Sequence, residues 1–267
     1  MHRLAVVFVP LLSLGVAAQT LTTQSAIVRD VEAVSLLRQS LAAMTNGVPV
    51  SDVALSGTAT RIAGSDQESG QAALEAKGTQ ESRVSLSLSN YALTEARNFV
   101  DGAPEGTYAG SDGIAHQLAQ HNCFTDAAWF FPALSSLASG LSGQSADVSY
   151  IGQETLYGRA VQHVTVWQSA SSPDVAAVKA IAHLSAIDWY LDSASAMPIA
   201  VRFTAHPPEN SSADMAVEVR FSNYQQVNGI LLPFHIEKFL NGGLVLDLTI
   251  GSATINSGLP DSDFILQ

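Results

Sequence analysis

The chain has 267 residues, of which 24 are acidic and 12 are basic, so its formal net charge at pH 7 is −12. A chain this acidic gains nothing from contacts with phosphate, so we expect neither a nucleic acid nor an anionic membrane surface as its partner. Because it has a single cysteine, Cys123, it can form no internal disulfide, and its stability must come from a buried core.

Residues 1–18 are predicted to be a secretory signal peptide. His2 and Arg3 give a short basic start, residues 4–16 are apolar, and small residues precede a cleavage point near Ala18. The apolar run is shorter than the ~20 residues that a membrane-spanning helix needs. We therefore expect an exported, periplasmic protein in which residues 19–267 form one domain, and we expect that domain to be a monomer.

The mature chain is predicted to begin with a helix over residues 25–45. Its apolar residues recur near the 3.6-residue period, and Asn46-Gly47 suits the left-handed position that follows a helix. After it the apolar residues recur with a period of two, which is typical of strands. Five strands are predicted in the first half of the chain, the last broken by a turn at 110–113: residues 53–62, 71–78, 83–89, 90–100 and 107–118.

Two further helices are predicted among the later strands. Residues 125–141 carry Phe130, Leu134 and Leu137 on one stripe, with Pro132 in the first turn. Residues 172–185 open with Ser172-Pro173-Asp174, the pattern of a capped helix start. Hairpins are predicted at residues 148–153 with 159–167, and at residues 187–192 with 199–205.

Residues 215–250 are predicted to form a meander of three antiparallel strands with one uniformly apolar face. The first turn is Asn228-Gly229, the strongest short hairpin signal, and Asn241-Gly242-Gly243 makes the second. The chain thus has about ten short strands and three helices. Many short antiparallel strands indicate a barrel or a strongly curved sheet, with the helices covering one face.

Three stretches resemble the Lol-type family of periplasmic lipoprotein-sorting proteins. The first is VRFSNYQQVNGILLPF at residues 219–234, an apolar strand with an aromatic residue, a polar step, a glycine and then Leu-Pro. The second is DWYLD at residues 188–192 followed by Met197-Pro198-Ile199, and the third is the ending, with Asn256 and Gly258. The family's regulatory arginine lies near the early strands, but no local motif ties Arg61 or Arg83 to that role.

The resemblance implies a mainly β (α+β) fold: an unclosed antiparallel β-barrel of about ten to eleven strands, with helices as a lid over the concave face. It also implies that the apolar interior shelters acyl chains of a lipid or lipoprotein. On this interpretation the strand residues that line the cavity are Val84, Leu86, Leu88, Val217, Val219, Phe221, Phe234, Leu246 and Leu248. Trp129, Phe130 and Leu134 would lie on the lid. The alternative is that these side chains only pack against each other as a filled core.

The sequence contains no Gly-x-Ser-x-Gly motif, phosphate-binding glycine loop or His-Glu-x-x-His pair. His116, His121 and Cys123 lie close together, but their spacing matches no standard metal site, so we predict no metal and no cofactor. The first hypothesis is therefore a non-enzymatic carrier. The alternative is an interaction or sensory module that binds an envelope membrane protein, and a hydrolase ranks third because no nucleophile–base set can be recognised.

Overall fold

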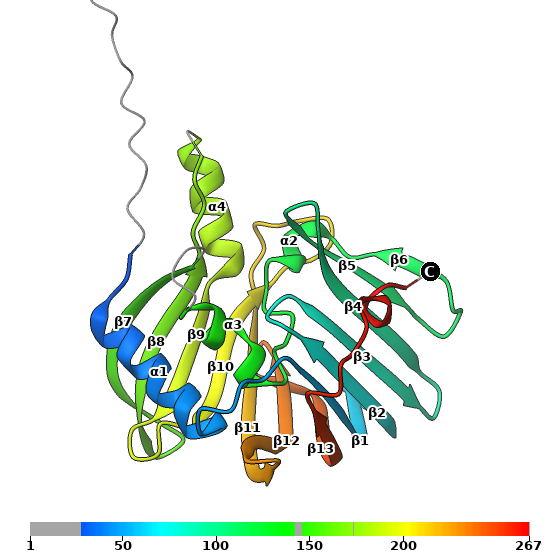
Figure 1. The fold of residues 1–267 in the computed structure, drawn as a ribbon. Coiled ribbons are helices and arrows are strands. Elements are labelled where there is room, and N and C mark those ends of the chain that lie inside the picture. The colour runs from blue at the N-terminus through cyan, green and yellow to red at the C-terminus, as the bar shows by residue number, and fades with distance from the viewer. Residues whose placement is uncertain (1–27, 142–145, 173, 267) are drawn as a thin grey trace, which may run out of the picture.

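The computed structural model describes residues 28–141, 146–172 and 174–266, and the predicted signal peptide lies outside them. The described residues form one antiparallel sheet of thirteen strands in the order β6-β5-β4-β3-β2-β1-β13-β12-β11-β10-β9-β8-β7 (Figure 1). The prediction of a mainly β fold with one unclosed sheet is confirmed, although the sheet has thirteen strands and not ten or eleven.

The strands of the first half are β1 (Asp52–Ala63), β2 (Asp66–Lys77), β3 (Glu81–Leu88), β4 (Ala92–Val100), β5 (Ala103–Ala109) and β6 (Ala115–Gln117). Those of the second half are β7 (Ala146–Leu156), β8 (Arg159–Gln168), β9 (Ile187–Asp192), β10 (Pro198–Ala205), β11 (Met215–Val227), β12 (Ile230–Leu240) and β13 (Gly243–Ile255). The two halves meet where β1 pairs with β13.

The strand order has a simple consequence for the chain path. The chain starts in the middle of the sheet at β1 and moves outward, strand by strand, to the edge strand β6. It then crosses to the opposite edge, β7, and returns strand by strand to β13 beside its starting point. The segment between β6 and β7 must therefore connect the two free edges of the sheet.

Tight turns join the long strands where the sequence predicts them. Asn228-Gly229 has φ values of 50° and 87°, and Asn241-Gly242 has 47° and 81°. Both residues of a type I′ turn need positive φ, which asparagine and glycine tolerate best. Because these turns fix the strand register, the alternation along each strand sends one set of side chains to a common apolar face.

Helix α1 (Val31–Thr45) lies on that apolar face, against β7, β8 and β12. It begins later than predicted because Asp30 is the N-cap: its carboxylate accepts hydrogen bonds from the backbone N–H groups of Glu32 and Ala33. Asn46 ends the helix in the left-handed conformation, as predicted. The helix buries Ala33, Leu37 and Met44 in the core.

The predicted helix over residues 125–141 is wrong. The segment contains only two short elements, the 3₁₀ turn η1 (Pro132–Leu134) and α3 (Ser136–Ser139), and the short helix α2 (Gln120–Cys123) ends before it. Trp129, Phe130 and Phe131 are consecutive and all buried, and a regular helix would turn at least one of them outward. Pro132 also removes a backbone donor, and Ser135 is extended, with φ −83° and ψ −170°.

Helix α4 (Val175–Ser185) stands at one end of the sheet beside β8 and β10, and projects from the molecule (Figure 1). Its N-cap is Asp174 and not Ser172, because the Asp174 carboxylate accepts from the N–H groups of Ala176 and Ala177. Pro173 lies outside the described residues. The last element, η2 (Asp261–Phe264), lies against β3 and β4, with Phe264 buried.

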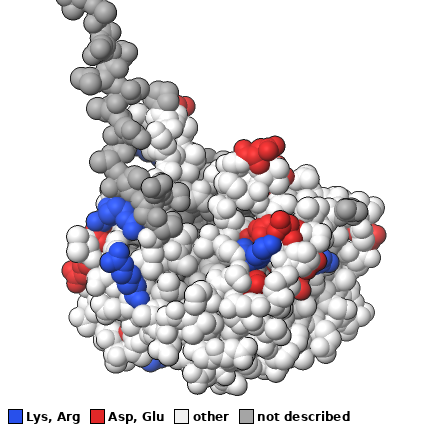
Figure 2. All heavy atoms as spheres, viewed as in Figure 1, with Lys and Arg blue, Asp and Glu red and all other residues white. Residues whose placement is uncertain are grey.

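In the view of Figure 2 most of the surface is neither acidic nor basic, and the charged side chains form a few separate groups. The described residues drawn on this face offer no extended basic surface to a polyanion. No helix among the described residues has the length and apolar character needed to cross a membrane.

Candidate functional site: the apolar face and its lid

The predicted cavity residues come together on one face of the sheet. Val84, Leu86 and Leu88 are on β3, and the other six are on β11, β12 and β13. Eight of the nine are at most 9% exposed and belong to one continuous core cluster, and Leu88 is partly buried against it. The strand alternation therefore predicts their common face correctly, while their contact with a guest stays a prediction.

We call residues 118–141, the described part of the segment between β6 and β7, the lid. Trp129, Phe130 and Leu134 are buried in the same cluster as the sheet residues. The indole N–H of Trp189 on β9 donates to Ser136 Oγ in the lid at 2.8 Å, while the Trp189 ring stacks on Phe221. In this arrangement lid side chains cover the apolar face.

Three charged side chains share the apolar face beneath the lid: Glu95 and Arg97 on β4, and Lys238 on β12. Arg97 Nε lies 2.8 Å from a Glu95 carboxylate oxygen, and Lys238 Nζ lies 4.2 Å from the centre of the Trp129 ring. Burial lowers the pKa of Lys238 to about 8, although the negative charge of Glu95 acts to raise it. Burial alone would raise the pKa of Glu95, but Arg97 and Lys238 hold it below its usual value.

Arg97 also holds the start of the lid. Its guanidinium donates to Thr125 Oγ1 at 2.7 Å and to the carbonyl oxygen of Asn122 at 3.2 Å. Arg97 is not one of the two early-strand arginines, Arg61 and Arg83, that the sequence singles out. The signal was present in the alternation of β4, because Leu93, Glu95 and Arg97 occupy successive positions on one face.

Within the lid itself, Asp126 is a buried acidic residue. Its carboxylate accepts from the backbone N–H of Ser136 at 2.7 Å. Burial raises the pKa of Asp126 to about 6, even though the hydrogen bonds from Ser136 act in the opposite direction. The lid is thus tied internally through Asp126 and Ser136, and tied to the sheet through Ser136 and Trp189.

A cavity of about 500 Å³ lies beside the lid. Ala146, Val166 and Ile187, which belong to the core cluster, line it from the β7–β9 side, and Asp126 and Ser136 line it from the lid. Phe99 and Pro104, from the β4–β5 hairpin, lie on its other side. The cavity therefore lies beside the lid between the outer strands of the two halves, a region called the seam from here on, next to the covered apolar face.

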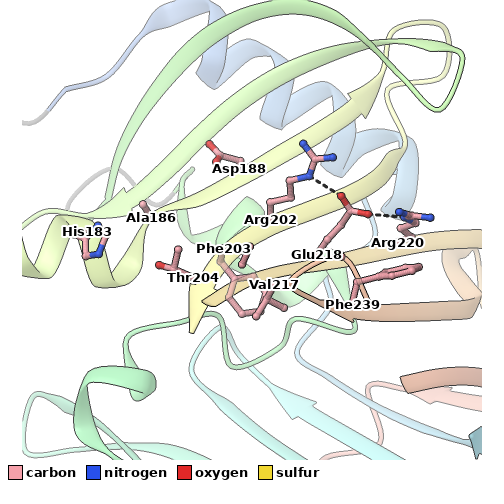
Figure 3. A pocket seen from close by; sticks show the side chains of 12 residues that line it. His183, Ala186, Asp188, Arg202, Phe203, Thr204, Val217, Glu218, Arg220 and Phe239 are labelled. Atoms are coloured by element: carbon pink, nitrogen blue, oxygen red, sulfur yellow. Dashed lines mark hydrogen bonds and ion pairs between the residues drawn. The ribbon is translucent and has the colours of Figure 1, made fainter. Parts of the chain in front are cut away.

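A second cavity, of about 370 Å³, lies on the opposite, polar face of the sheet (Figure 3). Glu218 on β11 accepts from Arg202 and from Arg220 at 2.6 Å each, and Phe239 lies under the Arg220 guanidinium. His183 lines the far end of this cavity. Of the predicted cavity residues, only Val217 borders it, so it is separate from the predicted site.

The structure does not unite His116, His121 and Cys123. His116 on β6 stacks on Tyr108, His121 on α2 lies against His206, and Cys123 approaches the carbonyl oxygen of Ala119. None of these three belongs to the groups of potential metal ligands found among the described residues.

One hydrogen-bonded row on the polar face resembles a nucleophile–base set that the sequence did not reveal. Ser222 Oγ lies 2.9 Å from His235 Nδ1, and His235 Nε2 lies 2.9 Å from Asp247. These residues sit on three adjacent strands, and neither cavity described above is lined by them.

An unclosed antiparallel sheet whose apolar face is covered by one helix and one lid segment is also the fold of solved lipoprotein-sorting, or LolA-like, proteins. No family model matches the sequence, and no curated protein matches it at the sequence level. The likeness is therefore one of structure.

Three solved structures illustrate the likeness. A putative outer membrane lipoprotein-sorting protein domain from Vibrio parahaemolyticus has a TM-score of 0.56 at 12% identity, covering 87% of this chain and 96% of that one. A DUF1329 family protein from Desulfovibrio piger has a TM-score of 0.54 at 9% identity, covering 88% of this chain and 98% of that one. A LolA superfamily protein from Nitrosomonas europaea has a TM-score of 0.51 at 13% identity, covering 87% of this chain and 97% of that one. The predicted resemblance is confirmed at the level of the fold.

Proposed function

We propose that this chain is an exported, non-catalytic carrier that shelters the acyl chains of a lipid or lipoprotein on the apolar face of its sheet. The observation that carries the proposal is the nature of the cover. The lid consists of elements of only three or four residues, and it connects the two free edges of the sheet. A segment of this kind can move without breaking a long helix or a row of strand-to-strand hydrogen bonds.

The energetics of an acyl chain support this role. Each CH₂ group transferred from water to an apolar surface gains about 0.8 kcal/mol. Core residues from β1–β3 and from β7–β13 form one continuous apolar surface beneath the lid. If the lid moves away, an alkyl chain takes over the contacts that Trp129, Phe130 and Leu134 make in the closed form.

The cavity at the seam supports an entry route. Its volume of about 500 Å³ lies within the roughly 300–1,000 Å³ that is usual for small-ligand sites. Its apolar side, with Val166 and Ile187, continues into the core cluster, and its polar side belongs to the lid. An acyl chain that enters through this cavity reaches the apolar face beside the lid.

The test is binding of acyl chains by the untagged protein purified without detergent. Native mass spectrometry should show a bound lipid, and the delipidated protein should bind a fluorescently labelled fatty acid. Leu88→Glu places a charge at the margin of the apolar face and should weaken binding on the order of tenfold or more. Ser87→Glu, the neighbouring position on the exposed polar face, is the matched control. Absence of both bound lipid and fatty-acid binding would contradict the proposal.

A second candidate, an interaction module for an envelope protein, has one observation in its favour. Helix α4 projects from the sheet and exposes apolar side chains, with Val175 64% exposed. Stoichiometric capture of an envelope protein that depends on Val175 and persists in lipid-free protein would favour this function over the carrier.

A further inference from the structure

One cluster of side chains outside the lid has the chemistry of a metal site. His183 in the last turn of α4, His206 just after β10 and Asp214 just before β11 offer one ligand atom each, and these atoms lie within 4.8 Å of one another. The Nε2 atoms of His183 and His206 lie 3.0 and 3.1 Å from the same oxygen, Asp214 Oδ1. Two imidazoles thus converge on one carboxylate.

We propose that His183, His206 and Asp214 bind a divalent transition-metal ion of the zinc class. Zinc lies about 2.0–2.2 Å from nitrogen and oxygen ligands, so neighbouring ligand atoms of a tetrahedral site are about 3.3 Å apart. The observed N···O distances of 3.0 and 3.1 Å need only a small expansion to admit the ion. A donor set of two imidazoles and one carboxylate suits zinc and excludes calcium and magnesium, which require oxygen ligands.

The burial of His206 is an independent observation for this site. The residue is 1% exposed, and its Nε2 atom faces Asp214 Oδ1, where the three ligand atoms converge. Packing alone would favour an apolar residue at a position this buried, whereas an imidazole held in a fixed place is a usual zinc ligand. His183 and Asp214 are each about half exposed, which gives an ion access from solvent.

The surroundings of the three side chains determine which ligand takes the fourth coordination position of the metal ion. Three protein ligands leave the fourth position of a tetrahedral ion to water. His183 also lines the cavity on the polar face (Figure 3), so this position adjoins a cavity of about 370 Å³. The backbone of His206 is held by Asn122 of α2, whose side chain accepts from the His206 N–H and donates to its carbonyl oxygen.

A second group of potential ligands, His235, Glu237 and Asp247, provides the control. It has one imidazole instead of two, and both ring nitrogens of His235 already have partners, Ser222 and Asp247. Borderline metals favour sites with more imidazole ligands, so we expect the ion at His183, His206 and Asp214. This inference does not depend on the carrier function.

The experiment is titration of the untagged protein with Zn²⁺ in competition with a chromophoric chelator. We expect one ion per chain, and Co²⁺ in its place should give the intense visible bands of tetrahedral coordination. His183→Ala and Asp214→Asn should each weaken the affinity at least about 100-fold, because even outer partners of metal ligands contribute 10–100-fold. His235→Ala should leave the affinity unchanged.

The two variants change half-exposed side chains, so they avoid the unfolding that replacing buried His206 invites. Hydrogen exchange should locate the Zn²⁺-dependent protection in the last turn of α4 and in the loop between β10 and β11. The proposal is overturned if the wild-type protein binds no Zn²⁺, if both variants bind it as tightly as wild type, or if His235→Ala removes the binding.

Discussion

Asp126 is the residue whose protonation state most directly affects the lid. Its carboxyl is buried, and its pKa in the folded protein is about 6, compared with an ordinary value of 3.8. Between these values the folded state holds the proton more tightly than the unfolded state does. The contribution of Asp126 to stability is therefore most favourable near pH 4 and is lost as the pH rises through about 6.

We predict that Asp126→Asn stabilises the protein at neutral pH. The difference between the two pKa values corresponds to about 3 kcal/mol, which is the upper limit of the gain at pH 7 because asparagine still accepts from Ser136. Near pH 4, where the wild-type carboxyl is mostly protonated, the two proteins should be almost equally stable. Denaturant unfolding of both proteins at pH 4 and pH 7 measures this, and an equal difference at both pH values would contradict it.

At the residue scale, the alternation of apolar side chains is enough to place the predicted cavity residues on one face. Glu95, Arg97 and Lys238 do not stand out in the sequence, because the period-two signal comes from the apolar members of each strand. Lys238 occupies the position two after Ile236 and so shares its face, which a reading of every residue on that face would have found. The convergence of His183, His206 and Asp214 depends on tertiary structure, because His183 and Asp214 are 31 residues apart in the sequence.

The lid is the element on which the carrier function depends, and its tie to the sheet can be weakened selectively. Trp189→Phe keeps an aromatic ring against Phe221 but removes the hydrogen bond to Ser136. A hydrogen bond contributes about 1 kcal/mol, so amide exchange within residues 126–139 should become about fivefold faster.

Trp167→Phe is the matched control for this change, since Trp167 lines the seam cavity but has no hydrogen bond to Ser136. It should leave exchange in the lid nearly unchanged. If both variants accelerate exchange equally across the whole chain, the effect is global destabilisation and the tie is not specific to the lid.

Gly57 lies at a β-bulge where the two halves of the sheet join. The register of β1 and β13 shifts between Ser56 and Gly57, and Gly251 is the extra residue on β13. A Cβ at Gly57 would lie 2.1 Å from the carbonyl oxygen of Thr249, whereas one at Gly251 would meet nothing nearer than 3.7 Å. The bulge thus brings the β13 backbone directly against Gly57.

We predict that Gly57→Ala destabilises the fold by about 1–3 kcal/mol or more, because the clash is with backbone and cannot be relieved by a side-chain rotation. Gly251→Ala, its neighbour across the same bulge, should change stability by less than about 1 kcal/mol. Thermal unfolding of the two variants makes the comparison. Equal destabilisation by both variants would contradict the prediction that the close approach of the β13 backbone makes Gly57 the sensitive position.

At the element scale, the strands followed from the sequence because turn residues and the period-two pattern agree. The lid did not, because Phe130, Leu134 and Leu137 have helical spacing while Trp129 and Phe131 are also apolar. When every side of a segment is apolar, periodicity no longer distinguishes a helix from an irregular buried segment. Pro132 was accepted as a first-turn residue, but it starts only a 3₁₀ turn.

At the scale of the whole molecule, the path of the chain gives the fold its functional potential. The two halves of the sheet grow outward from β1 and β13, so the chain runs from one free edge to the other through the segment that contains the lid, residues 118–141. The sequence predicted the unclosed sheet through the resemblance of its late strands. It did not predict the position of the lid in this path, because strand pairing between distant segments is not visible in local patterns.

The most direct test of the carrier function is to locate a bound alkyl chain within the fold. Photolysis of the protein with a fatty acid that carries a photoactivatable group in its chain, followed by peptide mass spectrometry, gives the positions in contact. Our account predicts cross-links to Phe221, Phe234 and Leu248 on the sheet and to Phe130 in the lid. Cross-links confined to the polar-face cavity, at Arg202, Arg220 and Phe239, or to α4 would contradict it.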